Sequence, residues 1–258
     1  MPPDFTFAAF DEFCQRLSHM PVFTVAAYLA RSVQPPTPFI ILRLDVDYRD
    51  RNAVHMARIA ERYHLRASFY FRRHAAGFDL DAIQAVAELD HEVGYHFETL
   101  DTCQGNFEQA EDLLLDHLEE LRAAGLPILT AASHGAIPTA PTYHHNFDLF
   151  ERVPDLFERA DLLGETTLSI DFGKVTYLSD ASWHWRRYPH FRPDIKGQPT
   201  SLHIISNDLV RRDAGLYINF HPHQWFAHPA STLYYRTRSR IGRHVLPWIK
   251  RYRLKNPV

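Results

Sequence analysis

Several features that direct the interpretation of many sequences are scarce or missing in these 258 residues. The two cysteines, Cys14 and Cys103, are too few for the disulfide framework of a small secreted scaffold, and they lack the spacing of a metal site. No run of about 18 uninterrupted apolar residues occurs, so no membrane-spanning helix is predicted. The formal net charge of -3 excludes a generally basic nucleic-acid-binding protein.

The first residues also lack the pattern of a secretory signal. The opening sequence MPPDFTFAAFDEF has neither a basic start nor a continuous apolar core. Internal repeats and low-complexity tracts are not visible either. We therefore predict a cytoplasmic protein, and a basic carboxyl-terminal segment extends this prediction to peripheral contact with the inner face of the membrane.

The sequence does contain the composition and the element order of a folded α/β protein. Hydrophobic residues make up 45% and charged residues 23% of the chain, enough to form a sizeable core. From residue 39 onward, strand-like apolar runs such as FIILRLDV alternate with segments of helical spacing such as NAVHMARIAERYH. This alternation predicts parallel strands, and the length suits one α/β barrel domain over residues 39–258.

Three further regions surround the predicted barrel. Residues 1–38 carry two short helical runs, which we interpret as an N-terminal helical cap. Residues 136–200 form a loop-rich insertion that includes a hairpin turning at Phe172 and Gly173. Residues 234–258 form a basic helical tail in which lysine and arginine occur without any acidic residue.

Carboxylates and imidazoles follow four of the predicted strands at the point where each strand ends. They are Asp45 and Asp47, His96 and Glu98, His134, and His221 and His223. Because side chains two residues apart on a strand point the same way, each pair faces one side of the sheet. The carboxyl ends of parallel strands form the rim on which barrels carry their sites, so these residues are predicted to converge there.

Such a cluster suits a divalent metal and hydrolytic chemistry. Two neighbouring carboxylates repel each other, by about 4 kcal/mol at ~4 Å and an effective dielectric near 20, and a cation relieves this repulsion. A divalent metal also makes hydroxide available near neutral pH, while a free carboxylate accepts a proton and a histidine protonates the departing group. Each residue alone has a structural interpretation, as a helix cap or a hydrogen-bonded histidine, but four strand ends together favour a site for hydrolysing an amide or an ester.

Four stretches resemble the NodB-homology polysaccharide deacetylases, in particular a divergent branch with DVD in place of adjacent aspartates. They occur in that family's order and are LRLDVDYRDRNAVHMARIAERYHLRASFYF, HEVGYHFETLD, AASHGAIP and YINFHPHQW. The resemblance implies a distorted (β/α) barrel of about seven strands, a divalent metal that is most often zinc, and hydrolysis of an N-acetyl, occasionally an O-acetyl, group on a sugar.

Within this resemblance four residues take roles. Asp45 matches the family's general base, Asp47 its metal-binding aspartate, His96 its first metal histidine and His221 its catalytic acid. The family's second metal histidine lies four residues after the first, where this chain has Leu100, and leucine cannot bind a metal.

Two residues can replace the missing histidine. Glu98 shares a strand face with His96, and His134 ends the next parallel strand. We favour His134, because an imidazole replaces an imidazole without adding negative charge, whereas Glu98 can orient a ligand histidine from behind. The same gap leaves open a degenerate site that binds no metal.

The segment SDASWHWRRYPHFRPDIK is rich in aromatic and arginine side chains that suit a carbohydrate. Aromatic faces stack on sugars, and arginine binds carboxylates or phosphates through paired hydrogen bonds. We predict Trp183, Arg186, Arg187, Arg192 and His223 as substrate-binding residues. The alternative is that these aromatic side chains only pack on the barrel.

The sequence therefore predicts a metal-dependent deacetylase with zinc as its cofactor. The expected partner is an N-acetylated carbohydrate, free or linked to a nucleotide or lipid, with no nucleic acid, and the resemblance implies surface-polysaccharide biosynthesis. Two alternatives stay open. One is a carbohydrate-binding protein that kept the fold and lost the chemistry, for which Leu100 is the main reason. The other is an amidohydrolase acting on a small non-sugar amide, because a fold does not determine a substrate.

Overall fold

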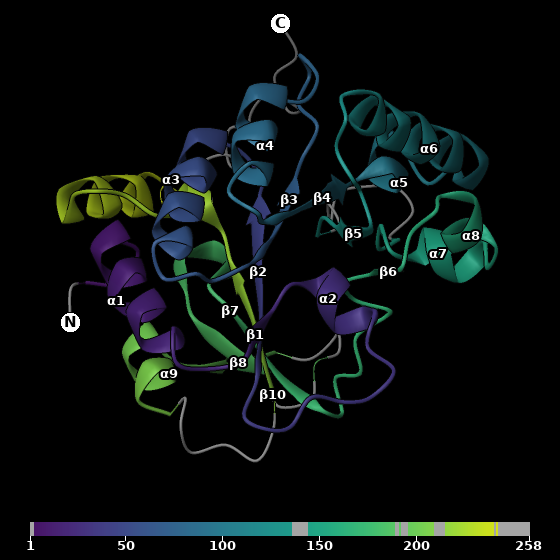
Figure 1. The fold of residues 1–258 in the computed structure, drawn as a ribbon. Helices are drawn as coiled ribbons and strands as arrows, with labels where there is room; N and C mark the ends of the chain where they lie inside the picture. Colours follow the sequence, from purple (N-terminus) through teal and green to yellow (C-terminus); the bar gives the residue numbers. More distant parts are fainter. Residues whose placement is uncertain are drawn as a thin grey trace, which may run out of the picture.

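The protein, seen in a computed structural model, is an α/β fold built on one sheet (Figure 1). The structure describes residues 3–135, 144–188, 191, 196–208, 215–239 and 241.

Parallel strands form the centre of the sheet, in the spatial order β6, β5, β4, β3, β2, β10, β7. Their bounds are Gly164–Glu165, Thr130–Ser133, Glu92–Phe97, Ser68–Phe71, Ile40–Val46, Gly215–Phe220 and Val175–Ser179 in that order. No backbone pairing among the described residues joins β6 to β7, so the sheet is open at that point. The predicted α/β order with about seven parallel strands is confirmed.

Three short strands complete the sheet. Strand β1 (Val22–Phe23) pairs in parallel with β2, and it links the N-terminal segment to the centre of the sheet. Strands β8 (Arg186–Tyr188) and β9 (Gln198–Pro199) extend the edge beyond β7 in antiparallel fashion.

Helices separate most of the parallel strands and cover the sheet (Figure 1). Their bounds are α1 Phe7–Leu17, α2 Val25–Leu29, α3 Asp50–Glu61, α4 Leu80–Ala87, α5 Thr99–Thr102, α6 Phe107–Ala123, α7 Asp148–Arg152, α8 Leu156–Arg159 and α9 Leu202–Asp208, with 3-10 turns η1 Ala181–Trp183 and η2 Pro222–Gln224. Residues 229–239 are also helical.

Local sequence explains where the longest helix begins and ends. The Asn106 side chain accepts a hydrogen bond from the Gln109 backbone amide and so caps α6. Leu114, Leu118 and Leu121 recur at helical spacing and are buried in the main core. Gly125 follows with a φ of +83, a conformation that glycine adopts without steric cost and that ends the helix.

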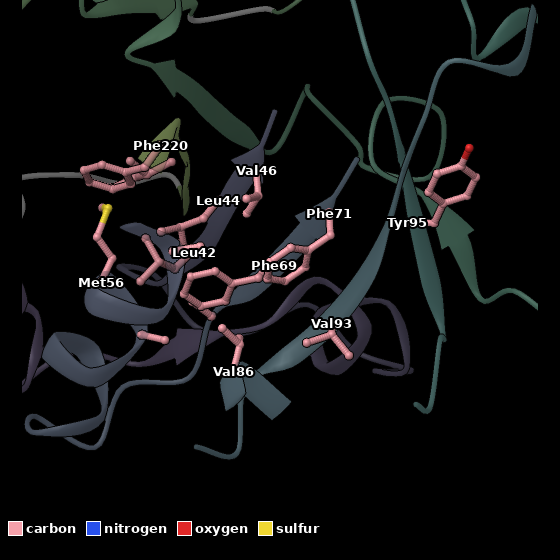
Figure 2. Close-up of a cluster of buried hydrophobic side chains, with 14 of the residues drawn as sticks. Leu42, Leu44, Val46, Met56, Phe69, Phe71, Val86, Val93, Tyr95 and Phe220 are labelled. Carbon is pink, nitrogen blue, oxygen red and sulfur yellow. The ribbon is translucent and has the colours of Figure 1, made fainter. Parts of the chain in front are cut away.

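The two faces of β2 explain how the site is positioned. Leu42, Leu44 and Val46 point outward into the main core, where Figure 2 shows them near Phe69 of β3 and Met56 of α3. The alternate residues point into the sheet's concave interior and change along the strand from apolar Ile41 to charged Arg43 and Asp45. One strand therefore supplies the apolar core with one face and the polar site with the other.

The N-terminal segment closes the end of the sheet opposite this polar region. The first backbone amides of α2 donate to side chains at the starts of two strands: Val25 N to Ser68 Oγ at 2.7 Å and Ala26 N to Glu92 Oε2 at 2.9 Å. Val25 and Tyr28 pack with Phe39 in the interior apolar cluster.

One predicted element is wrong. Residues 166–180 do not form a hairpin turning at Phe172 and Gly173, because β7 pairs in parallel with β10 and is part of the central sheet. The hairpin in this region is formed by β7 and β8, and its turn includes η1. The strand-like pattern of VTYLS was recognised, but its partner is far away in the sequence and could not be read from turn residues.

The described helices include none that is long and apolar enough to cross a membrane. Of the predicted basic tail, residues 234–239 and Ile241 are described and helical, whereas residue 240 and residues 242–258 lie outside the described part of the chain.

Candidate active site

The carboxyl ends of β2, β4, β5 and β10 meet around a cavity of ≈ 610 Å³. The predicted residues that line it are Asp45, Asp47, His96, His134, Trp183, His221 and His223. These strands are neighbours in the sheet apart from β3, which lies between β2 and β4, so their polar ends come together, whereas Glu98 does not line the cavity.

Asp47, His96 and His134 form a group that can hold a metal ion. One ligand atom from each residue lies within 4.8 Å of the other two. Asp47 Oδ1 is 3.3 Å from His96 Nε2 and 3.7 Å from His134 Nε2. One carboxylate oxygen and two imidazole nitrogens are a donor set that zinc accepts, and three protein ligands leave a position open for water or substrate.

Hydrogen bonding around His96 tests whether this group fits a cation. The Nδ1 atom of His96 lies 3.0 Å from the Ala132 carbonyl oxygen, and because a carbonyl only accepts, Nδ1 carries the hydrogen. In the neutral ring Nε2 then presents a lone pair toward Asp47 Oδ1, which is itself buried and receives no hydrogen bond from the described residues. Two lone pairs 3.3 Å apart repel each other, and a cation between them removes the repulsion, so these residues fit a metal.

The electrostatics of Asp47 and His134 agree with this assignment. Burial opposes ionisation of Asp47, but the contact with His96 and the nearby imidazoles of His221 and His223 outweigh burial and hold the pKa of Asp47 far below its usual value. Burial and the neighbouring His96 lower the pKa of His134 to about 4. At neutral pH the aspartate is ionised and His134 is neutral, which are the ligand forms.

Glu98 lies behind His134 rather than beside Asp47. Its Oε2 is 3.4 Å from His134 Nδ1, and its Oε1 accepts a hydrogen bond of 2.6 Å from Arg72. The carboxylate can therefore orient the imidazole from the side away from the metal position, as carboxylates do for many ligand histidines. Leu100 is buried in the main core, 1% exposed, so the position of the family's second histidine is used for packing.

Asp45 is bound on both oxygens by Arg43. The guanidinium donates from Nε to Oδ1 at 2.7 Å and from Nη2 to Oδ2 at 2.9 Å, and Asn219 Nδ2 adds a third bond to Oδ2 at 2.8 Å. Burial raises the pKa of Asp45, but the charges of Arg43, His96 and His221 outweigh it and lower the pKa overall. Asp45 is therefore ionised and fixed in position, and Oδ1 keeps one lone pair open.

The His221 ring is held by the carboxylate of Asp180, the residue that directly follows β7. Its Nδ1 lies 2.6 Å from Asp180 Oδ1, and Asp180 Oδ2 accepts from the indole nitrogen of Trp225 at 2.7 Å. Burial disfavours the charged ring, but the bond to Asp180 and the charges of Asp180, Asp47 and Asp45 outweigh burial and raise the pKa of His221 to about 9. The imidazolium can therefore donate a proton from Nε2, which lies 4.0 Å from Asp45 Oδ2.

His223 lies beside Asp47 but outside the three-residue group. Its Nδ1 is 3.3 Å from Asp47 Oδ2, and its ring stacks on Tyr48 with centroids 4.1 Å apart. Burial lowers the pKa of His223 to about 4. A neutral ring stacked on a half-exposed tyrosine forms one side of the cavity mouth.

The other predicted substrate-binding residues differ in whether they line the cavity. Trp183 is 5% exposed and packs against Phe5 with centroids 5.6 Å apart, although it also lines the cavity. Arg186 and Arg187 do not line the cavity, and Arg186 Nη1 instead donates to the Gly197 carbonyl at 3.0 Å. Arg192 lies outside the described residues.

Three residues of the site were missed from the sequence, namely Arg43, Asp180 and Asn219. Arg43 and Asn219 share a strand face with Asp45 and His221 respectively, since each lies two residues earlier, so the alternation rule contained a signal for both. Asp180 had no such signal, because its strand was assigned to a separate hairpin.

Comparison with known proteins finds only distant structural similarity. No protein-family model and no curated protein matches the sequence. The crystal structure of wild-type BA3943, a CE4 family pseudoenzyme from Bacillus anthracis, is similar with a TM-score of 0.45 and 12% identity over 80% of this chain and 62% of that chain. A BA3943 mutant, a CE4 family pseudoenzyme with restored enzymatic activity, gives a TM-score of 0.44 and 11% identity over 79% and 62%. This chain spans less than two thirds of the length of either structure.

Proposed function

We propose that this protein is a metal-dependent hydrolase that removes an N-acetyl group from a carbohydrate, with zinc as the metal. The observation that supports the proposal most strongly is the meeting of Asp47, His96 and His134 within 4.8 Å. A buried carboxylate, Asp45, and a histidine with a raised pKa, His221, lie on the same cavity wall.

Asp47, His96 and His134 would hold the metal. When bound, a divalent metal polarises a carbonyl group and lowers the pKa of a water molecule. Glu98 Oε2 lies 3.4 Å from His134 Nδ1 and can orient that ring, while the Ala132 carbonyl accepts a hydrogen bond from His96 Nδ1. These contacts leave the Nε2 atoms of both rings facing Asp47.

Asp45 and His221 are suited to opposite proton transfers. Asp45 is ionised and has an open lone pair on Oδ1, so it can accept the proton of an attacking water. His221 is protonated below pH 9 or so and can give its proton to the departing amine. Arg43 and Asp180 prevent these two side chains from turning away.

The carbohydrate assignment has two supports. The four motif stretches resemble those of the NodB-homology polysaccharide deacetylases, and the cavity has the size of a small-molecule site, for which 300–1,000 Å³ is a common range. Its walls combine polar side chains with the aromatic rings of Phe172, Tyr177 and Phe191, as a sugar requires. Cytoplasmic location, the cap formed by residues 1–38, the linkage of the sugar and the pathway stay predictions.

Two substitutions separate metal binding from proton transfer. Asp45→Asn is expected to retain one equivalent of zinc and to lose at least about 100-fold in kcat, because it removes the base and leaves the ligands intact. His134→Ala is expected to lose both zinc and turnover. Metal content by elemental analysis and acetate release from N-acetylated oligosaccharides and nucleotide sugars measure the two properties.

A surface histidine supplies the matched control. His19 lies on the exposed loop after α1 and makes no contact with the cavity, so His19→Ala should keep zinc and turnover at wild-type levels. Wild-type protein that binds no zinc, nickel, cobalt or manganese after reconstitution would show that the proposal is wrong and would favour a carbohydrate-binding role. Release of acetate only from small non-sugar amides would place the substrate in another class.

A further inference from the structure

The helix of residues 229–239, here named the terminal helix, carries exposed apolar side chains along one side. Leu233 is 68% and Tyr234 is 60% exposed, and Ile241, which is also helical, is 57% exposed. We name these three residues the apolar stripe. Leu233, Thr237 and Ile241 recur every four residues, so they follow one side of the helix. The stripe lines a groove of ≈ 510 Å³ together with Ala230, Thr237 and Arg238.

The other side of the terminal helix is fixed on the rest of the protein. Thr232 is 7% exposed, and its Oγ1 donates to the Phe5 carbonyl oxygen at 2.9 Å. The Tyr235 ring stacks on Phe226 with centroids 4.8 Å apart, and the Arg49 guanidinium lies 3.9 Å from the Tyr235 centroid. Figure 1 shows this helix, in yellow, at the edge of the fold near α1. The helix is therefore anchored through one side while the apolar stripe stays exposed.

The charge at this end of the chain has one sign. Of the 28 lysines and arginines, eight lie in residues 231–258, which contain no aspartate or glutamate. Residues 1–230 carry the other 20 basic side chains against 31 acidic ones. Arg238 is exposed and lines the same groove as the stripe. A negatively charged surface is thus attracted by this end of the chain and repelled by the rest of it.

The apolar stripe decides which negatively charged partner fits. Nucleic acids attract basic proteins mainly through their phosphates, and a row of exposed leucine, tyrosine and isoleucine adds little to such contacts. An anionic membrane attracts basic side chains and also accepts apolar side chains at the boundary between headgroups and acyl chains. Exposed apolar residues next to basic ones therefore favour lipid over nucleic acid.

We propose that the terminal helix docks on an anionic membrane surface, with the apolar stripe inserted at the headgroup boundary and Arg238 next to the lipid phosphates. Ser239 of the same helix lines the cavity of the candidate active site, so the docked protein holds that cavity close to the lipid surface. Docking requires neither metal nor turnover, and the proposal is therefore independent of the proposed hydrolase function.

Vesicle flotation of the full chain tests the proposal. The protein should bind vesicles of phosphatidylcholine with about 30% phosphatidylserine at least 10-fold more tightly than vesicles of phosphatidylcholine alone. Raising the NaCl concentration from about 0.1 M to about 0.5 M should weaken binding to the anionic vesicles, because salt screens the attraction.

Substitutions in the groove locate the contact. Leu233→Ser combined with Ile241→Ser removes both aliphatic side chains of the stripe and should weaken binding to anionic vesicles at least about 10-fold. Arg238→Gln, a milder change for use if the double variant does not fold, should weaken it about 5-fold. Val33→Ser combined with Ile204→Ser is the matched control. These residues are 71% and 50% exposed and lie outside the groove, so wild-type affinity is expected.

Each result has one meaning. Wild-type protein that binds neither kind of vesicle overturns the proposal, and so does equal affinity for the two kinds. Unchanged vesicle binding in the folded double variant of the stripe also overturns it. A dimer that dissociates in this variant, without any vesicle binding in the wild type, would show instead that the stripe binds a second copy of the chain. Failure to release acetate from any substrate would contradict only the proposed function.

Discussion

At the scale of single residues, the site depends on charges that are buried next to partners. Arg43 is 5% exposed, yet its guanidinium is paired with both oxygens of Asp45 and donates from Nη1 to Tyr217 Oη at 3.2 Å. Removing one member of such a pair leaves the other charge buried and unpaired, which costs about 3–5 kcal/mol. The pair therefore holds the proposed base in one position.

The pH dependence of turnover reports on His221. Its pKa is raised to about 9, so the proton donor is present at neutral pH and is lost as the pH rises through that value. Asp180→Asn removes the charge that helps to raise this pKa, and the alkaline limb of kcat/KM should then move down by about one to two pH units. Rate measurements from pH 6 to 10 at constant zinc show the shift.

Asp171 provides the control for this measurement. It is an exposed carboxylate near β7 that pairs with Lys174 at 3.1 Å and does not line the cavity. Asp171→Asn should leave the alkaline limb where it is in the wild type. A limb that stays in place in Asp180→Asn would mean that another group is the proton donor.

At the scale of elements, β4 combines a close packing position with a proposed metal ligand. Gly94 and His96 share one face of the strand, directed into the interior of the sheet. A Cβ at Gly94 would lie 2.6 Å from Cδ1 of the Tyr70 ring and 2.7 Å from the Thr130 carbonyl oxygen. Glycine at this position allows β3, β4 and β5 to lie close together, which brings His96 to the cavity.

Gly94→Ala is expected to lower the free energy of unfolding by about 1–3 kcal/mol, the usual cost of overpacking. The displacement of β4 should also weaken zinc binding, because His96 is two residues away. Gly135→Ala is the matched control, since a Cβ there meets no atom within 4 Å. Urea unfolding and zinc titration of both variants measure the effects, and equal stability of the two would contradict the packing argument.

At the scale of the whole molecule, the proposed metal would join three strands that are distant in the sequence. Asp47 follows β2, His96 lies on β4 and His134 follows β5. A ligand that binds only the folded state adds to its stability, and the gain depends on the ligand concentration relative to Kd. Zinc binding and global stability are therefore linked.

Zinc at 100 times its Kd should raise the free energy of unfolding by about 2.7 kcal/mol and the Tm by roughly 5–10 °C. Thermal unfolding with a chelator and with zinc gives the difference. Asp47→Asn removes the only carboxylate of the three-residue group, so its Tm should rise much less. An equal rise in this variant would place the zinc elsewhere.

Much of the fold could be predicted because its signals are local. Apolar runs and helical periodicity predicted the strand FIILRLDV and the helix NAVHMARIAERYH, which correspond within a few residues to β2 and α3. The alternation of side chains also predicted that Asp45 and Asp47 face the same way. These properties depend on residues a few positions apart, so the sequence by itself determined them.

Only the tertiary structure decided which distant residues meet. The pairing of β7 with β10, the contact of Asp180 with His221 and the contact of Asn219 with Asp45 depend on strand order and on distances across the sheet. The choice between His134 and Glu98 was likewise a matter of position, with His134 beside Asp47 and Glu98 behind it. Hydrogen bonds and ion pairs act over a few ångströms. The number of residues between two groups along the chain does not predict whether the fold brings them that close.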